Sequence, residues 1–440
     1  MIERLRARLS GRSAGEEDTG GDPDFRRNFA LGVANGVLYN NGLSFFNRTT
    51  IIPVFMASLG APSILISLTA LFEALGWHLP QLIASKYIVH KPRKMALYGW
   101  AAVIRVGGLL VATGAAFIAA SSPGLALILF ILGYGIFSIA GGFAGLVFME
   151  IVAKTCPKER RGSYFGLRAI FSGLVGLYLG VNVIKPVFAD WGYPYTFMIA
   201  FGAGTLLIAG SFYLFTRQRE PLQDDLPPER SMRAQFSTAL ALLAGNRPFR
   251  RFVLFRGLMM LWFAGIPYYM LFARERLGAS EAEMGTFISW EFAGLIVANL
   301  LWSYLSNNLG NRILLIIACA LGVLVSAAVL GYAIGLFGLP AWTFGAIFFA
   351  SAAVDSGVGT GGINYALEII PEGERPTYIG LMNTMLAMAL GLAAIAGGLR
   401  DLIGYIGLYV MTGGVALIAL GMILRLPEPR RAVRVRPVRG

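Results

Sequence analysis

Three carboxylic acids lie near the middle of long apolar stretches of this sequence: Glu73, Glu291 and Asp355. On insertion scales, an ionised side chain at the centre of a bilayer costs about 2.5–3.5 kcal/mol. Because desolvation penalises the charged form, a carboxyl group at this depth is suited to take up and release a proton. We therefore predict that these three residues are protonation and coupling sites. The alternative is that they only hold neighbouring helices together by hydrogen bonds.

A second group of polar residues has helical spacing. Asn40, Ser44 and Asn47 recur at positions i, i+4 and i+7, and Arg48 follows directly. These offsets place the side chains on one stripe of a helix, so we predict that the four residues contact a substrate. Hydrogen bonding between helices is the alternative. Arg105 lies deep in another apolar stretch, and we expect it to have a buried partner.

Motifs of known enzyme classes are missing from the sequence. It contains no His-Glu-x-x-His zinc motif, no Gly-x-Gly-Asp protease motif and no Ser/His pair in a recognisable context. The run from Gly357 to Gly362 resembles a nucleotide-binding loop, but it lies inside an apolar segment with no preceding strand. Cys156 and Cys319 form no cluster of metal ligands. We therefore expect no catalytic residue, no metal and no cofactor, and the protein is not expected to be an enzyme.

Composition places these residues in a membrane protein. The chain is 56% hydrophobic and 14% charged, whereas a soluble domain is about a quarter charged. The net charge of +13 comes from basic residues in short segments between apolar runs, which is a signal of membrane topology rather than of nucleic-acid binding. The expected partners are membrane lipid, a small-molecule substrate and H⁺, without nucleic acid, and the protein is expected to be a monomer.

Crossing about 30 Å of hydrocarbon takes roughly 20 apolar residues, and the chain has room for about a dozen such segments. The predicted spans are 28–57, 62–87, 95–120, 124–153, 162–188, 194–216, 250–275, 281–306, 312–337, 341–369, 377–401 and 405–425. Most of the 37 basic residues fall on one side of these spans. That side is predicted to be the cytoplasm, so both termini are expected inside the cell (plasma or inner) membrane.

The two halves of the chain repeat each other. Arg161 and Tyr164 match Arg375 and Tyr378 at a spacing of 214 residues, and Glu73 matches Glu291 at a spacing of 218. The predicted fold is therefore an all-α membrane protein whose twelve transmembrane helices form two parallel six-helix repeats. The predicted parts are a polar N-terminus (1–24), a first bundle (25–216), a cytoplasmic linker (217–249), a second bundle (250–426) and a basic tail (427–440).

These features resemble the major facilitator superfamily over residues 25–426. The family has the loop motif Gly-x-x-x-Asp-x-x-Gly-Arg-Lys. The segments Ser303–Arg312 and Ser85–Lys94 resemble degenerate copies of it, in which Asn307 and Val89 replace the acid. The resemblance implies a secondary active transporter that works by alternating access and is coupled to protons. The repeated loops predict a cytoplasmic gate made of Arg93, Lys94, Arg161, Arg312 and Arg375, although basic residues here could equally be topology anchors. A non-transporting assembly or sensor protein with the same fold is the alternative, and a membrane-embedded enzyme is a weaker one.

Overall fold

The computed structural model describes residues 23–78, 91–222, 245–370 and 375–429, and these residues are helical with connecting loops. They include ten helices that are long and apolar enough to cross a membrane. The chain is thus a multi-pass membrane protein. The first helices are α2 (Pro23–Ser44), α3 (Ile51–Ser58), α4 (Ser63–His78), α6 (Met95–Phe117), α7 (Pro123–Thr155), α8 (Lys158–Leu179), the π-helical turn η2 (Gly180–Ile184), α9 (Lys185–Asp190) and α10 (Tyr195–Thr216).

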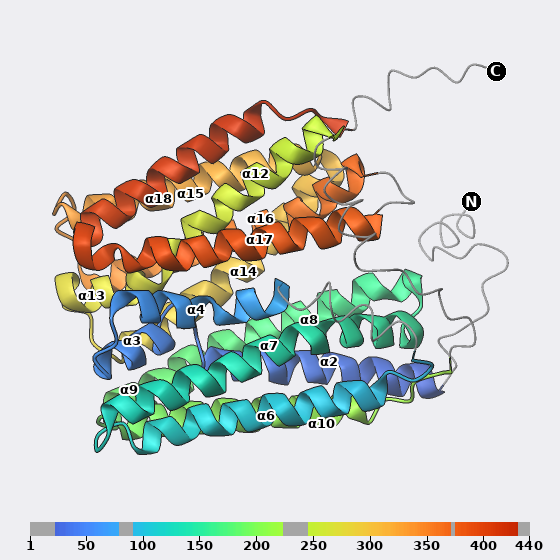
Figure 1. Cartoon of the computed structure of the whole chain (residues 1–440), viewed down its shortest axis with the longest axis horizontal. Helices are drawn as coiled ribbons and strands as arrows, with labels where there is room; N and C mark the ends of the chain where they lie inside the picture. The colour runs from blue at the N-terminus through green and yellow to red at the C-terminus, as the bar shows by residue number, and fades with distance from the viewer. Residues whose placement is uncertain (1–22, 79–90, 223–244, 371–374, 430–440) are drawn as a thin grey trace, which may run out of the picture.

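The later helices follow after residue 244. They are α12 (Arg247–Trp262), the 3₁₀ turn η3 (Phe263–Tyr268), α13 (Tyr269–Leu277), α14 (Glu283–Asn308), α15 (Asn311–Ala333), η4 (Ala341–Phe344), α16 (Gly345–Ile369), α17 (Arg375–Gly398) and α18 (Arg400–Leu424). Figure 1 shows two layers of roughly parallel helices, with α2–α10 in one and α12–α18 in the other. We call them the first and second helix groups. The groups pack on each other mainly through α4 with α17 and α8 with α14.

Close approach of helices inside the first group depends on small residues. A Cβ on Gly108 of α6 would lie 2.6 Å from the carbonyl oxygen of Gly133 on α7, and a Cβ on Gly133 would lie 2.5 Å from that of Gly108. Only glycine at both positions lets the two backbones touch. This is how helices gain packing energy in lipid, where no hydrophobic force drives them together.

The predicted continuous span 28–57 is wrong, because the helix breaks at residues 45–50 between α2 and α3. The predicted span 250–275 is also interrupted, by the 3₁₀ turn η3. The break and the turn are 218 residues apart, the spacing found in the sequence repeat. Pro267 explains η3, since proline lacks the N–H that an α-helix needs. The break at 45–50 contains no proline and instead relies on Asn47.

The predicted boundary between residues 401 and 405 coincides with a kink inside α18. Gly404 has a φ of 66° there, a conformation that glycine adopts at little cost, so two helices meet at this residue. A further turn between Gly398 and Arg400 ends α17 slightly before the predicted residue 401.

Candidate functional site

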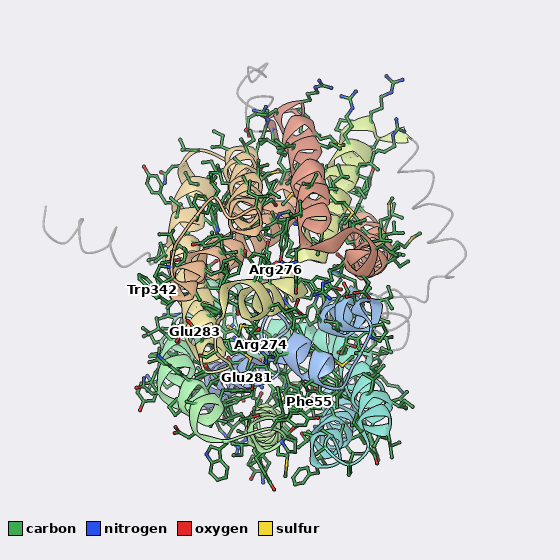
Figure 2. All side chains as sticks on the ribbon, turned by 90° about the vertical axis from the view of Figure 1, so that its left-hand side faces the viewer. Phe55, Arg274, Arg276, Glu281, Glu283 and Trp342 are labelled. Atoms are coloured by element: carbon green, nitrogen blue, oxygen red, sulfur yellow. The ribbon has the colours of Figure 1, made fainter. Side chains whose placement is uncertain are left out.

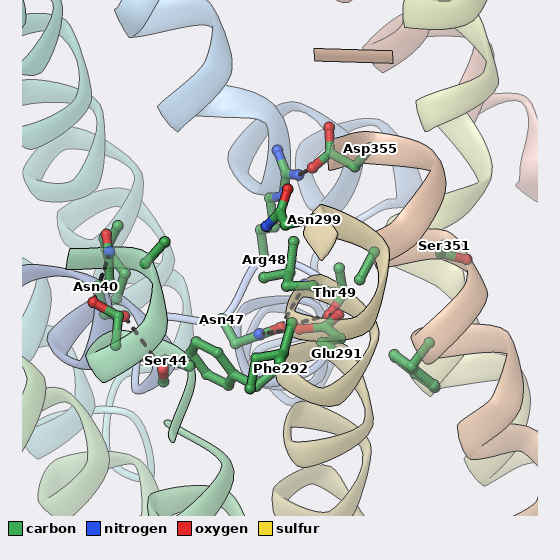
Figure 3. A pocket seen from close by; sticks show the side chains of 18 of the residues that line it. Asn40, Ser44, Asn47, Arg48, Thr49, Glu291, Phe292, Asn299, Ser351 and Asp355 are labelled. Carbon is green, nitrogen blue, oxygen red and sulfur yellow. Dashed lines mark hydrogen bonds and ion pairs between the residues drawn. The ribbon is translucent and has the colours of Figure 1, made fainter. Parts of the chain in front are cut away.

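A cavity of about 740 Å³ lies between the two helix groups (Figure 3). Its lining comes from α2 and the break after it, from α8, from the η3–α13 junction, and from α14 and α16. The polar lining residues are Asn40, Ser44, Asn47, Arg48, Thr49, Ser172, Glu291, Asn299, Ser351 and Asp355. Residues far apart in sequence thus share one chamber near the middle of the helices.

Consecutive residues of the break bind two acids of the second group. The side-chain amide of Asn47 donates to Glu291 at 2.8 Å, and the Thr49 hydroxyl donates to the same carboxylate. Between them, the Arg48 guanidinium forms an ion pair with Asp355 at 2.5 Å. The pair is open to the cavity, because 29% of the Arg48 side chain and 41% of the Asp355 side chain are exposed.

Asn47 also holds the break itself together. Its side-chain oxygen accepts hydrogen bonds from the backbone N–H groups of Thr49 at 2.8 Å and Thr50 at 2.9 Å, and from the Thr50 hydroxyl at 2.9 Å. These are backbone donors that the interrupted helix leaves without an intrahelical acceptor. The oxygen of the Asn47 amide therefore closes the turn that precedes α3, and its nitrogen reaches across to Glu291.

Asn40 and Ser44 line the cavity but bond within the first group. Asn40 donates to the Ser172 hydroxyl at 3.1 Å, and the Ser44 hydroxyl donates to the carbonyl oxygen of Asn40 at 3.3 Å. The structure therefore brings all four residues of the predicted substrate stripe to the cavity wall. For Asn40 it also contains a hydrogen bond between helices, as the alternative interpretation expected, whereas the bond of Ser44 stays within α2.

Sequence reasoning missed Thr49, Asn299 and Ser351. Thr49 belongs to the polar run Asn47–Thr50, whose length in an apolar segment is a signal for a break. Asn299 follows Glu291 by eight residues in α14, so the two share a helix face, and its side-chain oxygen accepts from Ser356 at 2.5 Å. The Ser351 hydroxyl is buried and has no hydrogen-bond partner among the described residues, and no sequence pattern singles it out.

Arg105 is not among the described residues that line the cavity. Arg105 donates to the Tyr39 hydroxyl at 2.6 Å, and its guanidinium lies 5.2, 4.3 and 4.9 Å from the ring centres of Tyr39, Phe137 and Phe212. Its Nε–H also donates to the carbonyl oxygen of Phe137 at 3.3 Å. Hydrogen bonds and cation–π attraction to aromatic rings thus hold this guanidinium. Glu73 lies in α4, and its side chain is outside the described part of the structure.

The predicted gate residues lie at or near the starts of α6, α8, α15 and α17. Figure 1 shows these ends on the same side of the molecule as the start of α2 and the end of α18, which we call the terminal side. Arg161 donates to the carbonyl oxygens of Ala153 and Cys156 at the end of α7, and Arg312 donates to that of Leu424 at the end of α18. The contacts of Arg161 stay within the first helix group, and the contact of Arg312 stays within the second. Arg93 is exposed, and the side chain of Arg375 falls outside the described part.

Lys94 belongs to a charge cluster that sequence reasoning did not predict. Its buried ammonium pairs with Glu150 at 2.6 Å, and the backbone N–H groups of Lys94 and Met95 donate to Glu220. Lys154 pairs with the same Glu220 at 2.7 Å. Glu220 lies in the segment predicted to be a solvated linker, yet only 2% of its side chain is exposed. It caps the start of α6, which explains its burial.

The two groups touch at the opposite end, which we call the far side. The Ser63 hydroxyl donates to Asp401 at 2.5 Å, and the Tyr268 hydroxyl donates to the Ser63 carbonyl at 2.7 Å. Figure 2 views this end, where Arg274 and Glu281 form an ion pair at 2.8 Å. A Cβ on Gly285 of α14 would lie 2.2 Å from the Gly180 carbonyl oxygen. The far side is thus tightly packed between the groups.

Comparisons with known proteins agree with this architecture. The family model described as Major Facilitator Superfamily matches residues 266–440. A bacterial homologue of the iron transporter ferroportin in its inward-facing state has a TM-score of 0.68 at 14% identity, covering 91% of this chain and 98% of that chain. A bacterial ferroportin homologue in the outward-facing state has a TM-score of 0.60 at 13% identity, covering 91% and 99%.

An auto-inhibited peptide transporter of the POT family has a TM-score of 0.68 at 12% identity, covering 94% of this chain and 98% of that chain. No curated protein matches the chain by sequence. At these identities the structural likeness concerns the fold, which this chain shares with membrane transporters.

Proposed function

We propose that this chain is a secondary active transporter of the major facilitator superfamily. The family match over residues 266–440 and the shared fold support this proposal. The transporter moves a small solute across the cell membrane by alternating access, coupled to protons. Its twelve spans form two six-helix bundles, 25–216 and 250–426, joined by the cytoplasmic linker 217–249. The positive-inside pattern supports cytoplasmic termini, and the protein acts as a monomer.

The observation that carries this proposal is the set of bonds across the cavity. Asn47, Arg48 and Thr49 of one bundle bind Glu291 and Asp355 of the other. Protonation of either acid weakens its bond across the two bundles, so proton binding and relative movement are linked at one place. A broken helix at mid-membrane is also a common site for substrate and coupling ions. A non-transporting scaffold would need neither the cavity nor the acids.

Residue roles follow from this geometry. Asp355 and Glu291 take up the coupling proton, and Glu73 remains a candidate from the repeat alone. Asn40, Ser44, Asn47 and Arg48 form the substrate wall. Lys94, Arg161 and Arg312, with Arg93 and Arg375, belong to the cytoplasmic gate, which is open in this conformation. The described contacts of Arg161 and Arg312 stay inside their own helix groups, whereas Ser63 and Asp401 join the two groups at the far side, which supports that state.

The test is uptake into proteoliposomes driven by an imposed pH gradient, with a mixture of small solutes outside and mass spectrometry of the lumen. Wild type should accumulate at least one solute, and Asp355→Asn and Glu291→Gln should reduce that uptake at least tenfold. Glu281→Gln is the matched control, because Glu281 lies outside the cavity and pairs with Arg274 at the far side. Absence of any accumulated solute would contradict transport. Equal uptake without the gradient would contradict proton coupling.

A further inference from the structure

A second hollow lies between α6 and α10, on the side of the first helix group that faces away from the second group. Figure 1 shows the two helices together at the outer edge of their layer. The hollow has a volume of about 690 Å³, and we call it the outer groove. Its lining comes from residues 96–110 of α6 and 209–216 of α10. Neither helix contributes to the described wall of the cavity between the groups, so the outer groove is separate from that cavity.

The outer groove depends on small residues of α6. Gly99 and Gly107 both line it, about two helical turns apart, and a Cβ on either would meet no other atom within 4 Å. Gly108 is different, because its Cβ would collide with the backbone of α7. Gly99 and Gly107 therefore leave open space between the exposed side chains of Trp100 and Val103. Since an empty hollow forfeits van der Waals contacts, an apolar chain from the membrane gains contacts by filling it.

The outer groove lies mostly in one leaflet of the membrane. On α6 it extends from Ala96, at the start of the helix, to Leu110, which is about 21 Å at 1.5 Å per residue. On α10 it follows the last two turns, which end at Thr216. One leaflet contributes about 15 Å, half of a hydrocarbon core of about 30 Å. The groove thus runs from the terminal-side surface to just beyond the midplane, which is the reach of an acyl chain, whereas a spanning helix of a second copy would also contact the far-side half of α6.

Two arginines lie at the terminal-side end of the groove. Arg217 directly follows Thr216 and donates to the hydroxyl of the lining residue Tyr213 at 2.6 Å, with its guanidinium carbon 4.7 Å from the ring centre. Arg27 of α2 donates to the carbonyl oxygen of Arg217 at 3.1 Å, and both arginines are exposed. A guanidinium has five N–H donors, so these bonds leave donors of both for a phosphate, which arginine binds in bidentate fashion.

The acids on the adjoining segments have basic partners of their own. Asp24 pairs with Arg219 at 2.7 Å, and Glu220 pairs with Lys154 at 2.7 Å. The described bonds of Arg27 and Arg217 go to a carbonyl oxygen and a tyrosine hydroxyl rather than to these carboxylates. The charge at the end of the groove therefore suits an anionic headgroup.

We propose that the outer groove binds an anionic phospholipid, with one acyl chain along α6 between Gly99 and Leu110 and the phosphate on Arg27 and Arg217. Apolar surface alone is ordinary for a helix in lipid. The hollow, its restriction to one leaflet and the arginine pair at its end are what fit a phospholipid, because arginines near a membrane surface attract anionic headgroups. This lipid is a bound partner of the first helix group and is distinct from the transported solute.

Trp100 reports on the groove, because it lines the hollow and is 71% exposed. Brominated acyl chains quench tryptophan fluorescence on contact. The full-length protein is reconstituted into phosphatidylcholine vesicles that contain a small fraction of brominated phosphatidylglycerol or, separately, of brominated phosphatidylcholine. The difference between wild type and Trp100→Phe isolates the Trp100 signal from that of the other tryptophans. Brominated phosphatidylglycerol should quench this signal at a mole fraction at least three times lower than brominated phosphatidylcholine.

Two changes, each with a matched control, test the headgroup and the chain separately. Arg27→Gln with Arg217→Gln should remove the preference for phosphatidylglycerol, while Arg219→Gln, at the same end but paired with Asp24, should keep it. Gly107→Leu should raise the fraction of brominated phosphatidylglycerol needed for half quenching at least threefold, since leucine occupies the space of the chain. Gly114→Leu should not, because it enters open space on α6 outside the groove. Melting curves of each variant show that it is folded.

Equal quenching of Trp100 by the two lipids in wild type would overturn the proposal. A preference that survives the double arginine change, or that Arg219→Gln removes equally well, would overturn it too. If neither lipid quenches Trp100, the groove is covered by another part of the chain or by a second copy, which light scattering separates, and the lipid assignment is wrong. None of these readouts depends on transport, so the lipid site and the proposed function can fail independently.

Discussion

At the scale of single residues, an ion pair between Arg48 and Asp355 joins the two helix groups across the cavity. Its two side chains are partly exposed to the cavity, so its strength lies below that of a fully buried pair, for which the loss of one partner costs 3–5 kcal/mol. Loss of one partner leaves a single charge near the membrane centre, whereas loss of both does not.

A double-mutant cycle tests this pair. Asp355→Asn should lower the melting temperature more than the double change Arg48→Gln with Asp355→Asn, because the single variant leaves Arg48 uncompensated. The expected coupling energy between the two side chains is about 0.5–3 kcal/mol. Unfolding of each variant on heating in detergent is measured by intrinsic tryptophan fluorescence. Additive effects of the two changes would show that the pair does not hold the bundles together.

The residues of the site could be predicted from sequence to different degrees. Glu291, Asp355 and the Asn40–Arg48 stripe stood out because polar groups in apolar segments need a reason to be there, and all of them line the cavity. The partner of each acid could not be predicted, since pairing depends on how two bundles meet. Arg105 stood out for the same reason. Its guanidinium packs against aromatic rings, and an apolar sequence does not indicate which rings will surround a buried cation.

At the scale of elements, the break between α2 and α3 is the feature that positions the site. Here hydrogen bonds of the Asn47 side chain take the place of helical ones. Its oxygen accepts from the N–H groups of Thr49 and Thr50, and its nitrogen donates to Glu291. The sequence predicted one continuous helix here, because hydrophobicity gives the length of a span but not the continuity of its backbone. In η3 the presence of Pro267 was visible, yet a proline alone does not specify a 3₁₀ turn.

Two substitutions separate the roles of Asn47. Asn47→Asp keeps an oxygen that can accept from the Thr49 and Thr50 N–H groups but loses the N–H donor to Glu291. Asn47→Ala loses the acceptor and the donor. We expect both variants to lose pH-driven uptake, and only Asn47→Ala to lose about 1 kcal/mol of stability as well. Asn182→Ala is the control, since Asn182 is exposed and bonds within its own helix. Normal uptake by Asn47→Asp would contradict a link between the break and Glu291.

The start of α6 depends on an acid from the segment after α10. Glu220 accepts from two backbone N–H groups and from Lys154, and hydrogen bonds to charged groups contribute about 1.5–3 kcal/mol each. Glu220→Gln should therefore lower the melting temperature clearly, while Glu275→Gln, which changes a half-exposed pair with Arg400, should have little effect. A melting temperature of Glu220→Gln equal to that of the wild type would show that this cap does not stabilise the protein.

At the scale of the whole molecule, the two bundles are in contact at the far side and share the cavity at mid-membrane. The division into two helix groups was foreseeable from the repeat, because matching segments fold alike. The conformation was not, since the contacts that join the two groups depend on how their surfaces meet. In the proposed alternating-access cycle, the bond between Ser63 and Asp401 belongs to the closure that opens for substrate to pass.

The most direct test of alternating access is the sidedness with which a cysteine in the cavity is labelled. Asn299 is exposed and lines the cavity, so Asn299→Cys, with Cys156 and Cys319 replaced by serine, reports entry of a membrane-impermeant thiol reagent in proteoliposomes. A second protein adds Ser63→Cys and Asp401→Cys, which are oxidised before labelling to lock the far side. We expect labelling from both sides in the unlocked protein, labelling from the terminal side alone in the locked protein, and recovery on reduction. Labelling from one side only in the unlocked protein, or from both sides in the locked protein, would contradict alternating access to this cavity.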